Sequence, residues 1–281
     1  MPSPDFPSLA PPQPAAAGDF LALLARQGLA GHPVPEVHGP LPPQTEATTI
    51  LAFKFKGGIL VAGDRRATAG NVVVYDRADK VLEIDRHSLM AIAGVPATAW
   101  EMARTLGHSF QFYRRSQLQE MSLEGKVRAL SRLLRENVGL VMQGIGVVVP
   151  IFATFDLQAN LPRLYFYDAM GAEFEATDFA ASGSGSPAVR AILYYANTYG
   201  PRPLARLNEE DALLVALRAL DTAAENDTAT GSVDRHGRVY PVIKIVNATG
   251  IVTLPDRLLA KAYQRNLASL PKHTPKFADL E

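Results

Sequence analysis

The sequence predicts an α+β fold, on the basis of three observations. Apolar residues make up 47% of the 281 residues, which is enough for a large core. Hydrophobic patterning alternates groups of short strands with pairs of helices along most of the chain. The patterned part begins with a strand–turn–strand segment. This order allows two packed sheets with helices on both outer faces, although periodicity alone leaves other α+β arrangements open.

The first patterned segment is a hairpin. Strands at 48–55 and 58–64 are separated by a Lys-Gly-Gly turn, whose glycines can adopt the positive φ that a tight hairpin needs. The second strand ends on Asp64, and two arginines follow it. Taken alone, a Gly-Asp pair at the end of a strand is weak evidence for a functional site.

The remaining elements follow from periodicity, capping residues and breakers. Strands are predicted at 71–75, 80–84, 89–93, 147–155, 163–167, near 173, 239–247 and 250–254. Helices are predicted at 97–113, 122–142, 187–197, 209–225 and 256–267. Ser122 and Asn208 are suited to cap two of these helices, and Pro187 suits a first helical turn.

Residues 1–47 differ in composition from the rest. They hold many of the prolines and an alanine run, which predicts a mostly disordered or extended segment. One helix is expected from Asp19 to Leu29, with Asp19 as its cap and an apolar stripe along it. It is interpreted either as a transient helix in a tail or as a docking element that binds a partner.

Composition excludes several classes of protein. The formal net charge is zero, so no electrostatic footprint for nucleic acid or an anionic membrane is expected. There is no cysteine, and no apolar run approaches the roughly 20 residues of a membrane span. No basic region precedes Arg26, so a secretory signal is not predicted and the cytoplasm is the expected location. The six histidines are not at metal-ligand spacing, and no metal or cofactor is expected.

Three motifs identify a family resemblance. Thr48-Thr49-Ile50, the run Gly63-Asp64-Arg65-Arg66-Ala67-Thr68, and Lys80 stand in order, with Asp64 16 and Lys80 32 residues after Thr48. Together they resemble the β subunit of the bacterial, actinobacterial-type 20S proteasome, a threonine protease of the N-terminal-nucleophile hydrolase class. The resemblance covers about residues 48–255. It implies a four-layer αββα sandwich, with 1–47 as a cleaved propeptide and 48–281 as the catalytic domain.

The implied nucleophile is a threonine at a new N-terminus. A threonine hydroxyl needs a base, and a free α-amino group with a pKa of about 7.7–8.0 supplies one on the adjacent carbon. An internal threonine lacks that base, so activity requires cleavage between Ala47 and Thr48. Choosing Thr49 would put both family spacings off by one residue, so the hypothesis is Thr48.

The resemblance also implies roles for other residues. Lys80 would favour the deprotonated hydroxyl, Asp64 would orient Lys80, and Gly94 would donate a backbone N–H to the oxyanion. Ser184, Asp227 and Thr230 would support the threonine amine. The substrate pocket would be lined by Ala67, Thr68, Ala78, Leu82, Ile92, Pro96 and Trp100, and these uncharged residues predict cleavage after apolar residues.

Two residues depart from the family pattern. Ala47 stands where glycine usually precedes the scissile bond, and Ser232 stands where a second glycine is common. Cleavage needs a strained turn that glycine adopts most easily, so Ala47 is expected to slow processing without preventing it. The run Gly183-Ser-Gly-Ser lacks the pattern of a phosphate-binding loop and is not interpreted as one.

The resemblance implies partners as well. Two inner heptameric β rings would stack between outer rings of α subunits, and an ATPase unfoldase ring would feed unfolded protein through the α ring. Three alternatives remain: a noncatalytic ring subunit, the related hexameric ATP-dependent protease, and an amidase of the same class. Retention of Thr48, Asp64, Lys80 and Gly94 disfavours the first, and the long N-terminal segment disfavours the second. Lys80 at its spacing disfavours the third.

Overall fold

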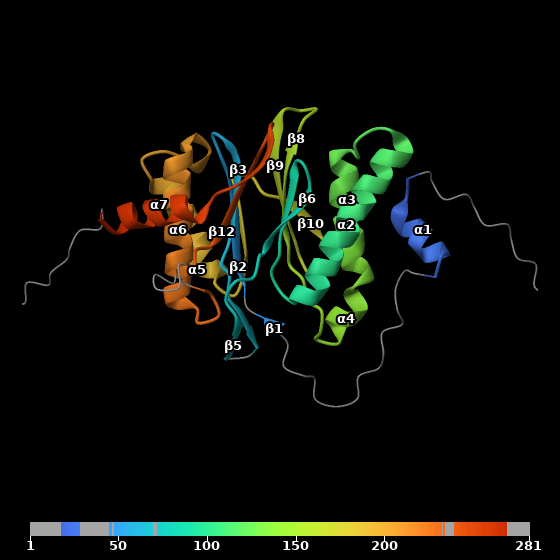
Figure 1. Ribbon diagram of the computed structural model, residues 1–281, viewed down its shortest axis with the longest axis horizontal. Helices are drawn as coiled ribbons and strands as arrows, with labels where there is room; N and C mark the ends of the chain where they lie inside the picture. Colours follow the sequence, from blue (N-terminus) through green and yellow to red (C-terminus); the bar gives the residue numbers. More distant parts are fainter. Residues whose placement is uncertain are drawn as a thin grey trace, which may run out of the picture.

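Two five-stranded antiparallel sheets pack face to face, with helices on both outer sides (Figure 1). The computed structural model describes residues 18–28, 45–46, 48–69, 72–231, 233 and 239–268. Sheet I has the strand order β11-β2-β3-β12-β13, and sheet II has the order β10-β9-β8-β7-β6. The predicted four-layer αββα sandwich is confirmed.

The strand bounds are as follows. Sheet I contains β2 (Thr49–Phe55), β3 (Gly58–Gly63), β11 (Phe179–Gly183), β12 (Val242–Asn247) and β13 (Gly250–Thr253). Sheet II contains β6 (Val81–Asp85), β7 (Ser88–Ala91), β8 (Ile151–Asp156), β9 (Leu161–Tyr167) and β10 (Glu173–Glu175). A small third sheet joins β1 (Thr45–Glu46), β4 (Ala67–Ala69) and β5 (Val72–Tyr75) at one end of the sandwich, the lower end in Figure 1.

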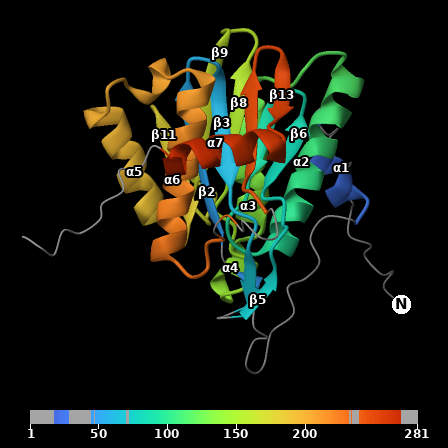
Figure 2. The same ribbon diagram turned by 60° about the vertical axis from the view of Figure 1, so that its left-hand side comes forward.

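Each sheet is covered by its own set of helices. Sheet II carries α2 (Pro96–Gln117), α3 (Leu123–Glu136) and α4 (Val138–Met142). Sheet I carries α5 (Ser186–Tyr199), the short 3₁₀ helix η1 (Leu204–Arg206), α6 (Glu209–Asn226) and α7 (Asp256–Ala268), as Figure 2 shows. None of the helices in the described part of the chain is long and apolar enough to cross a membrane.

Strand alternation explains why three separate cores form. On β2, Ile50 and Ala52 face sheet II, whereas Leu51 and Phe53 face the helices α5 and α6. Successive side chains of a strand point to opposite faces, so one apolar strand serves two cores. A third core joins sheet II to α2 and α3 and includes Leu106. The central hairpin is therefore buried on both faces, as its nearly continuous apolar sequence indicates.

The structure corrects several predicted boundaries. The helix predicted over 122–142 is two helices, because the chain turns at Asn137, whose side-chain amide donates to Gly146 O at 2.7 Å. The strand predicted from 147 begins at Ile151, because the preceding residues bridge to Gly94 instead. Strands β1, β4 and β11 are absent from the prediction, since they are short or lack a strong alternating pattern.

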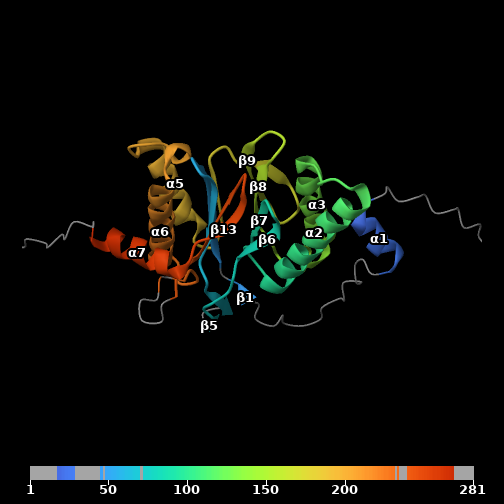
Figure 3. The same ribbon diagram turned by 45° about the horizontal axis from the view of Figure 1, so that its top comes forward.

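The predicted N-terminal helix is present as α1 (Phe20–Arg26), and it packs on this chain's own helices α2 and α3 (Figure 3). Asp19 caps it by accepting a hydrogen bond from Ala22 N at 3.0 Å, and the same carboxylate pairs with Arg132 at 3.2 Å. Phe20 lies 5.5 Å from the ring of Phe112, and Leu21 is buried in the helix-side core. The described part of the N-terminal segment thus docks within its own subunit.

Leu21→Ala is expected to loosen α1 while leaving the sandwich intact, because its side chain is the buried apolar anchor of this helix. Amide hydrogen exchange within 22–26 should rise by about tenfold or more, with little change in the main cores. Leu23→Ala is the matched control, since Leu23 is 36% exposed on the same helix. Equal exchange rates in both variants would show that Leu21 does not hold α1 in place.

Candidate active site

A buried ion pair connects the two sheets. Asp64 follows β3 of sheet I, and Lys80 precedes β6 of sheet II. The Lys80 ammonium donates to Asp64 Oδ1 at 2.7 Å, and the two residues are 3% and 1% exposed. Lys80 also donates to the carbonyl of Arg66. A buried charge is tolerated only when it is paired and hydrogen-bonded, and this pair meets both conditions.

Backbone groups complete the surroundings of Asp64. Its Oδ1 accepts a hydrogen bond from Thr49 N at 2.8 Å, and its Oδ2 accepts from Arg66 N and Gly231 N, both at 2.9 Å. Three N–H donors and one ammonium therefore hold the carboxylate. Arg66 further joins the turn after β3 to the distant 227–231 loop, because its guanidinium donates to Thr228 O and Thr230 O.

The environment lowers the pKa of Lys80. Burial is the main cause, since it disfavours the charged ammonium, and the nearby Arg66 guanidinium adds to it. The Asp64 carboxylate acts in the opposite direction without cancelling the burial. A perturbed, buried lysine beside a cavity is typical of functional sites.

Thr48 lines two cavities. The first, of about 560 Å³, is lined by Thr48 together with Lys80 and Gly94. The second, of about 750 Å³, is lined by Thr48 together with Gly94 and Ser184. The carbonyl of Thr48 accepts a hydrogen bond from Ser184 N at 3.1 Å. This approach needs glycine at position 183, since a Cβ there would lie 1.7 Å from Thr48 O.

The neighbouring Thr49 has a different environment. Its hydroxyl is 2.6 Å from the Thr230 hydroxyl and accepts a hydrogen bond from Gly185 N at 3.0 Å. Thr49 is fully buried, and neither cavity includes it in its lining. Thr49 therefore stabilises the site, whereas Thr48 borders open space.

Gly94 has a backbone conformation that suits an N–H donor facing the cavities. It forms an antiparallel bridge with Val148, in which Val95 N donates to Val147 O and Val149 N donates to Ala93 O. In such a pair the N–H of Gly94 itself points away from the bridged segment. Its φ is +106°, and a Cβ there would lie 2.0 Å from Val147 O, so only glycine fits.

Ser184, Asp227 and Thr230 form one hydrogen-bonded group. Asp227 Oδ2 accepts from the Ser184 hydroxyl at 2.6 Å and from the Thr230 hydroxyl at 2.5 Å. Burial raises the pKa of Asp227, but the hydrogen bonds from Ser184 and Thr230 outweigh it and hold this pKa below its usual value. This group contacts Thr48 through the hydrogen bond from Ser184 N to Thr48 O. It contacts Thr49 through the hydrogen bond between the Thr49 and Thr230 hydroxyls.

The first cavity contains most of the predicted substrate-pocket residues. Its lining includes Ala67, Ala78, Ile92, Pro96 and Trp100. It also includes residues that the sequence analysis missed, from β5, the start of α2, and α4 with the loop after it: Val74, Tyr75, Val95, Ala97, Thr98, Leu140, Ile145 and Gly146. The three residues around Pro96 follow from its position in the chain, whereas only tertiary packing brings the residues of β5 and of 140–146 to the site.

Two predicted pocket residues lie elsewhere. Leu82 packs against the core between sheet II and α2–α3, because strand alternation turns it away from the inter-sheet side that Val81 occupies. Thr68 is buried on β4, where it pairs with Glu46 of β1. The two residues that depart from the family pattern, Ala47 and Ser232, lie outside the described residues.

The site contains residues that the sequence analysis did not select: Thr49, Arg66, Gly183, Gly185 and Gly231. The glycines serve through backbone N–H groups or through the lack of a Cβ, so no side-chain chemistry points to them. Within the described ranges, no group of three or more histidine, aspartate or glutamate side chains is arranged to hold a metal ion.

Comparison with known proteins identifies the family of this chain. Residues 45–237 match the proteasome subunit family. The chain is 40% identical to proteasome subunit beta 2 of Thermomonospora curvata, with 86% of this chain and 85% of that protein covered. It is 36% identical to a proteasome subunit beta of Acidothermus cellulolyticus, with 89% of this chain and 86% of that protein covered. The chain therefore has the N-terminal-nucleophile hydrolase fold and belongs to the proteasome family, among its β subunits.

Lys80→Ala is expected to destabilise the chain only modestly, by about 1–3 kcal/mol, because three backbone N–H groups still satisfy Asp64. Asp64→Ala should cost more, about 3–5 kcal/mol, because it removes the carboxylate from a buried ammonium and from three donors. Urea unfolding of the two variants and of the wild type measures the difference. A larger loss for Lys80→Ala than for Asp64→Ala would contradict this account of the ion pair.

Proposed function

We propose that this β subunit is a catalytic threonine endopeptidase whose nucleophile is the hydroxyl of Thr48. The observation that carries the proposal is that Thr48, Lys80 and Gly94 line a single cavity, with Lys80 held by the buried Asp64. In the proposed roles, these residues would supply a nucleophile, a cation that tunes it and a backbone donor around one space. Proteasome β subunits as a family are generally proteases, which agrees with this chemistry.

The proposed reaction uses the free amine that Thr48 gains after cleavage. The neutral amine takes the hydroxyl proton while the oxygen attacks the substrate carbonyl carbon. The Gly94 N–H stabilises the oxyanion, and the nearby Lys80 ammonium favours the deprotonated oxygen. The C–N bond then breaks, the leaving amine takes the proton, and an ester remains on Thr48. Water hydrolyses that ester and restores the hydroxyl.

The same hydroxyl is proposed to release the mature N-terminus. Attack of the Thr48 oxygen on the Ala47 carbonyl forms an ester as the C–N bond breaks, and the nitrogen of Thr48 takes up the proton. Hydrolysis of the ester leaves the Ala47 carboxylate and a free amine. Support comes from the backbone near the bond, since Ser184 N holds the Thr48 carbonyl and Gly183 allows its close approach.

The position of β1 supports a mode of substrate binding. Thr45 pairs with Ala69 and Glu46 pairs with Thr68, so these two residues lie as an added strand on β4. Once this segment leaves, an extended substrate could pair with the same edge, with backbone hydrogen bonds supplying affinity that does not depend on sequence. Thr68 would then contribute through its strand and not through its side chain.

The proposed setting is a chambered assembly. Membership of the family implies assembly with α subunits into a proteasome core. Stacked heptameric β rings, an ATPase ring that feeds unfolded protein, and a cytoplasmic location are proposals that follow from the resemblance. A noncatalytic subunit is the main alternative, and the buried Lys80–Asp64 pair disfavours it, because such a pair has a desolvation cost that an apolar core avoids.

Thr48→Ala is expected to leave the full-length chain uncut, because the attacking oxygen is lost. Intact mass of particles assembled with the α subunit measures this. Thr49→Ser is the control, since it keeps a hydroxyl for Thr230 and Gly185 and should still be cut before Thr48. Normal processing of Thr48→Ala would mean that another protease makes the cut.

Lys80→Ala is expected to abolish turnover of peptide substrates in assembled particles, because the hydroxyl loses the cation that favours its deprotonated form. The loss should be about 10²-fold or more. Native mass spectrometry checks that the variant assembles. Urea unfolding of the same variant distinguishes a loss of catalysis from a loss of folded protein. Turnover near the wild-type level would remove Lys80 from the mechanism.

The first cavity is expected to select apolar residues before the scissile bond. None of its described lining residues is acidic, so an arginine or lysine side chain would be buried without a partner. Each buried methylene contributes about 0.8 kcal/mol, so discrimination among apolar residues should be modest. Fluorogenic peptides ending in Leu, Tyr, Arg and Glu give the kcat/KM ratios. A higher value for Arg or Glu than for both apolar peptides would contradict the assignment.

A further inference from the structure

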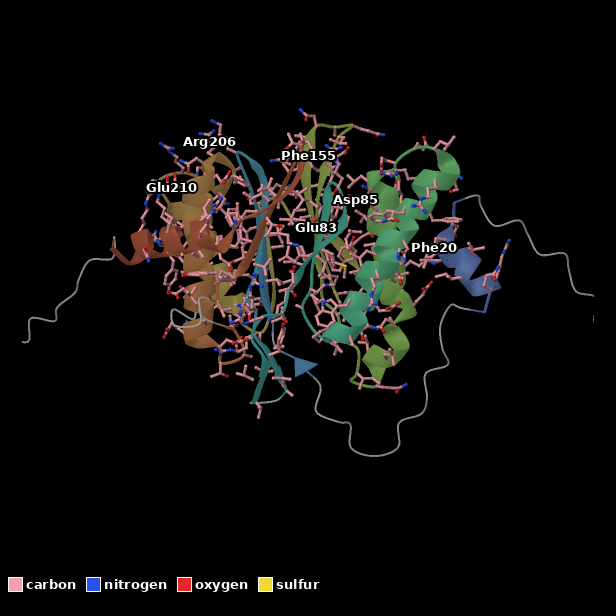
Figure 4. All side chains as sticks on the ribbon, in the orientation of Figure 1. Phe20, Glu83, Asp85, Phe155, Arg206 and Glu210 are labelled. Carbon is pink, nitrogen blue, oxygen red and sulfur yellow. The ribbon has the colours of Figure 1, made fainter. Side chains whose placement is uncertain are left out.

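Lys244 lies on β12, the strand between β3 and β13 of sheet I, and is only 6% exposed. Its strand neighbours at the same face, Val242 and Val246, belong to the core between the two sheets. The Lys244 ammonium crosses to the edge of sheet II, where it donates to Glu83 Oε1 at 3.1 Å and to Asp79 Oδ2 at 3.5 Å. Glu83 lies on β6 beside sheet I (Figure 4).

An apolar side chain would be the ordinary choice at this position. A lysine in the middle of a buried strand has to be desolvated along its whole length, and it is seldom buried unless its charge is paired. Both of its acidic partners are about half exposed, so the ion pairs by themselves are a weak source of stability. The two Lys244 ion pairs therefore affect the geometry of the groups they join more than they affect the stability of the fold.

The acidic partner Asp79 directly precedes Lys80. Asp79 Oδ1 accepts a hydrogen bond from Val81 N at 2.9 Å, so the carboxylate spans the peptide units around Lys80 while its Oδ2 faces Lys244. On the other side, Lys244 is paired across the strands with Val61 of β3, three residues before Asp64. The Lys244 side chain thus connects β12, which pairs with β3 just before Asp64, to the turn that carries Lys80.

We propose that Lys244 is a positioning residue that fixes the 79–81 turn against sheet I, so that the Lys80 ammonium stays at Asp64. The Lys80–Asp64 pair spans two sheets, and sheets that only pack through apolar side chains can shift by fractions of an ångström. The Lys244 ion pairs give the same junction a directional connection. Two hydrogen bonds fix the backbone nearby, from Ala78 N to Arg65 O and from Ile92 N to Lys80 O, and the Asp79 side chain adds the third constraint.

The test compares Lys244→Met, which keeps an unbranched side chain of nearly the same length without its charge, with Lys244→Arg, which keeps the charge. Ile245→Val is the matched control, because Ile245 is buried on the same strand but faces the helix-side core. Hydrogen exchange of the Val81 amide in the assembled particle reports the turn directly. It should rise by about tenfold in Lys244→Met and stay near the wild-type rate in the other two.

The kinetic readout rests on the proposed function. In Lys244→Met, kcat for an apolar peptide should fall by about tenfold while KM changes little, because the nucleophile is misplaced and the substrate cavity is not. Lys244→Arg should recover most of kcat. Adding Asp79→Asn to Lys244→Met should cause little further loss, because Lys244→Met already removes the contact between Lys244 and Asp79.

The two proposals fail in distinguishable ways. Wild-type particles without peptidase activity would contradict the proposed function, whereas the exchange rate at Val81 would still decide the role of Lys244. An unchanged Val81 exchange rate in Lys244→Met would overturn the positioning role. Equal loosening in Lys244→Met and Ile245→Val would also overturn it, since that result indicates general destabilisation of β12.

Discussion

The buried ion pair between Asp64 and Lys80 is the constraint on which the site depends. Each partner comes from a different sheet, so the pair forms only when the sheets pack in one register. The desolvation of two charges is offset only by close geometry, and the 2.7 Å contact and three backbone N–H donors supply it. The loop at Gly231 also depends on this ion pair, because the Gly231 N–H donates a hydrogen bond to Asp64.

Backbone geometry, more than side-chain chemistry, shapes the space around Thr48. Gly183 permits the close approach of the Thr48 carbonyl, and Gly94 turns its N–H away from the bridged segment. Both have positive φ values and backbone neighbours that a Cβ would strike, so neither position tolerates another residue without strain. The result is a threonine that lines two cavities, one lined mainly by apolar side chains and the other including Ser184.

The N-terminal segment shows how the described fold relates to the proposed maturation. Helix α1 packs on the outer face of α2 and α3, while β1 adds to β4 beside Thr48. The segment is therefore held at two places, one on the helix layer of sheet II and one on the small third sheet. Only the second contact is near the proposed scissile bond, which separates a docking role for α1 from the chemistry at Thr48.

The sequence by itself predicted most of the elements in their order, the apolar central hairpin and the cap at Asp19, because local periodicity and capping residues carry that information. The set Thr48, Asp64 and Lys80 was selected by the family resemblance, and the tertiary structure brings Asp64 and Lys80 together and places Lys80 on the same cavity as Thr48. It could not place Leu82 or Thr68 correctly, nor find Tyr75 and Leu140, because which residues meet at a cavity depends on strand register and helix packing. The contribution of Lys244 was equally hidden. A lysine within an apolar strand has meaning only once the facing sheet supplies Asp79 and Glu83, and that juxtaposition exists only in the tertiary structure.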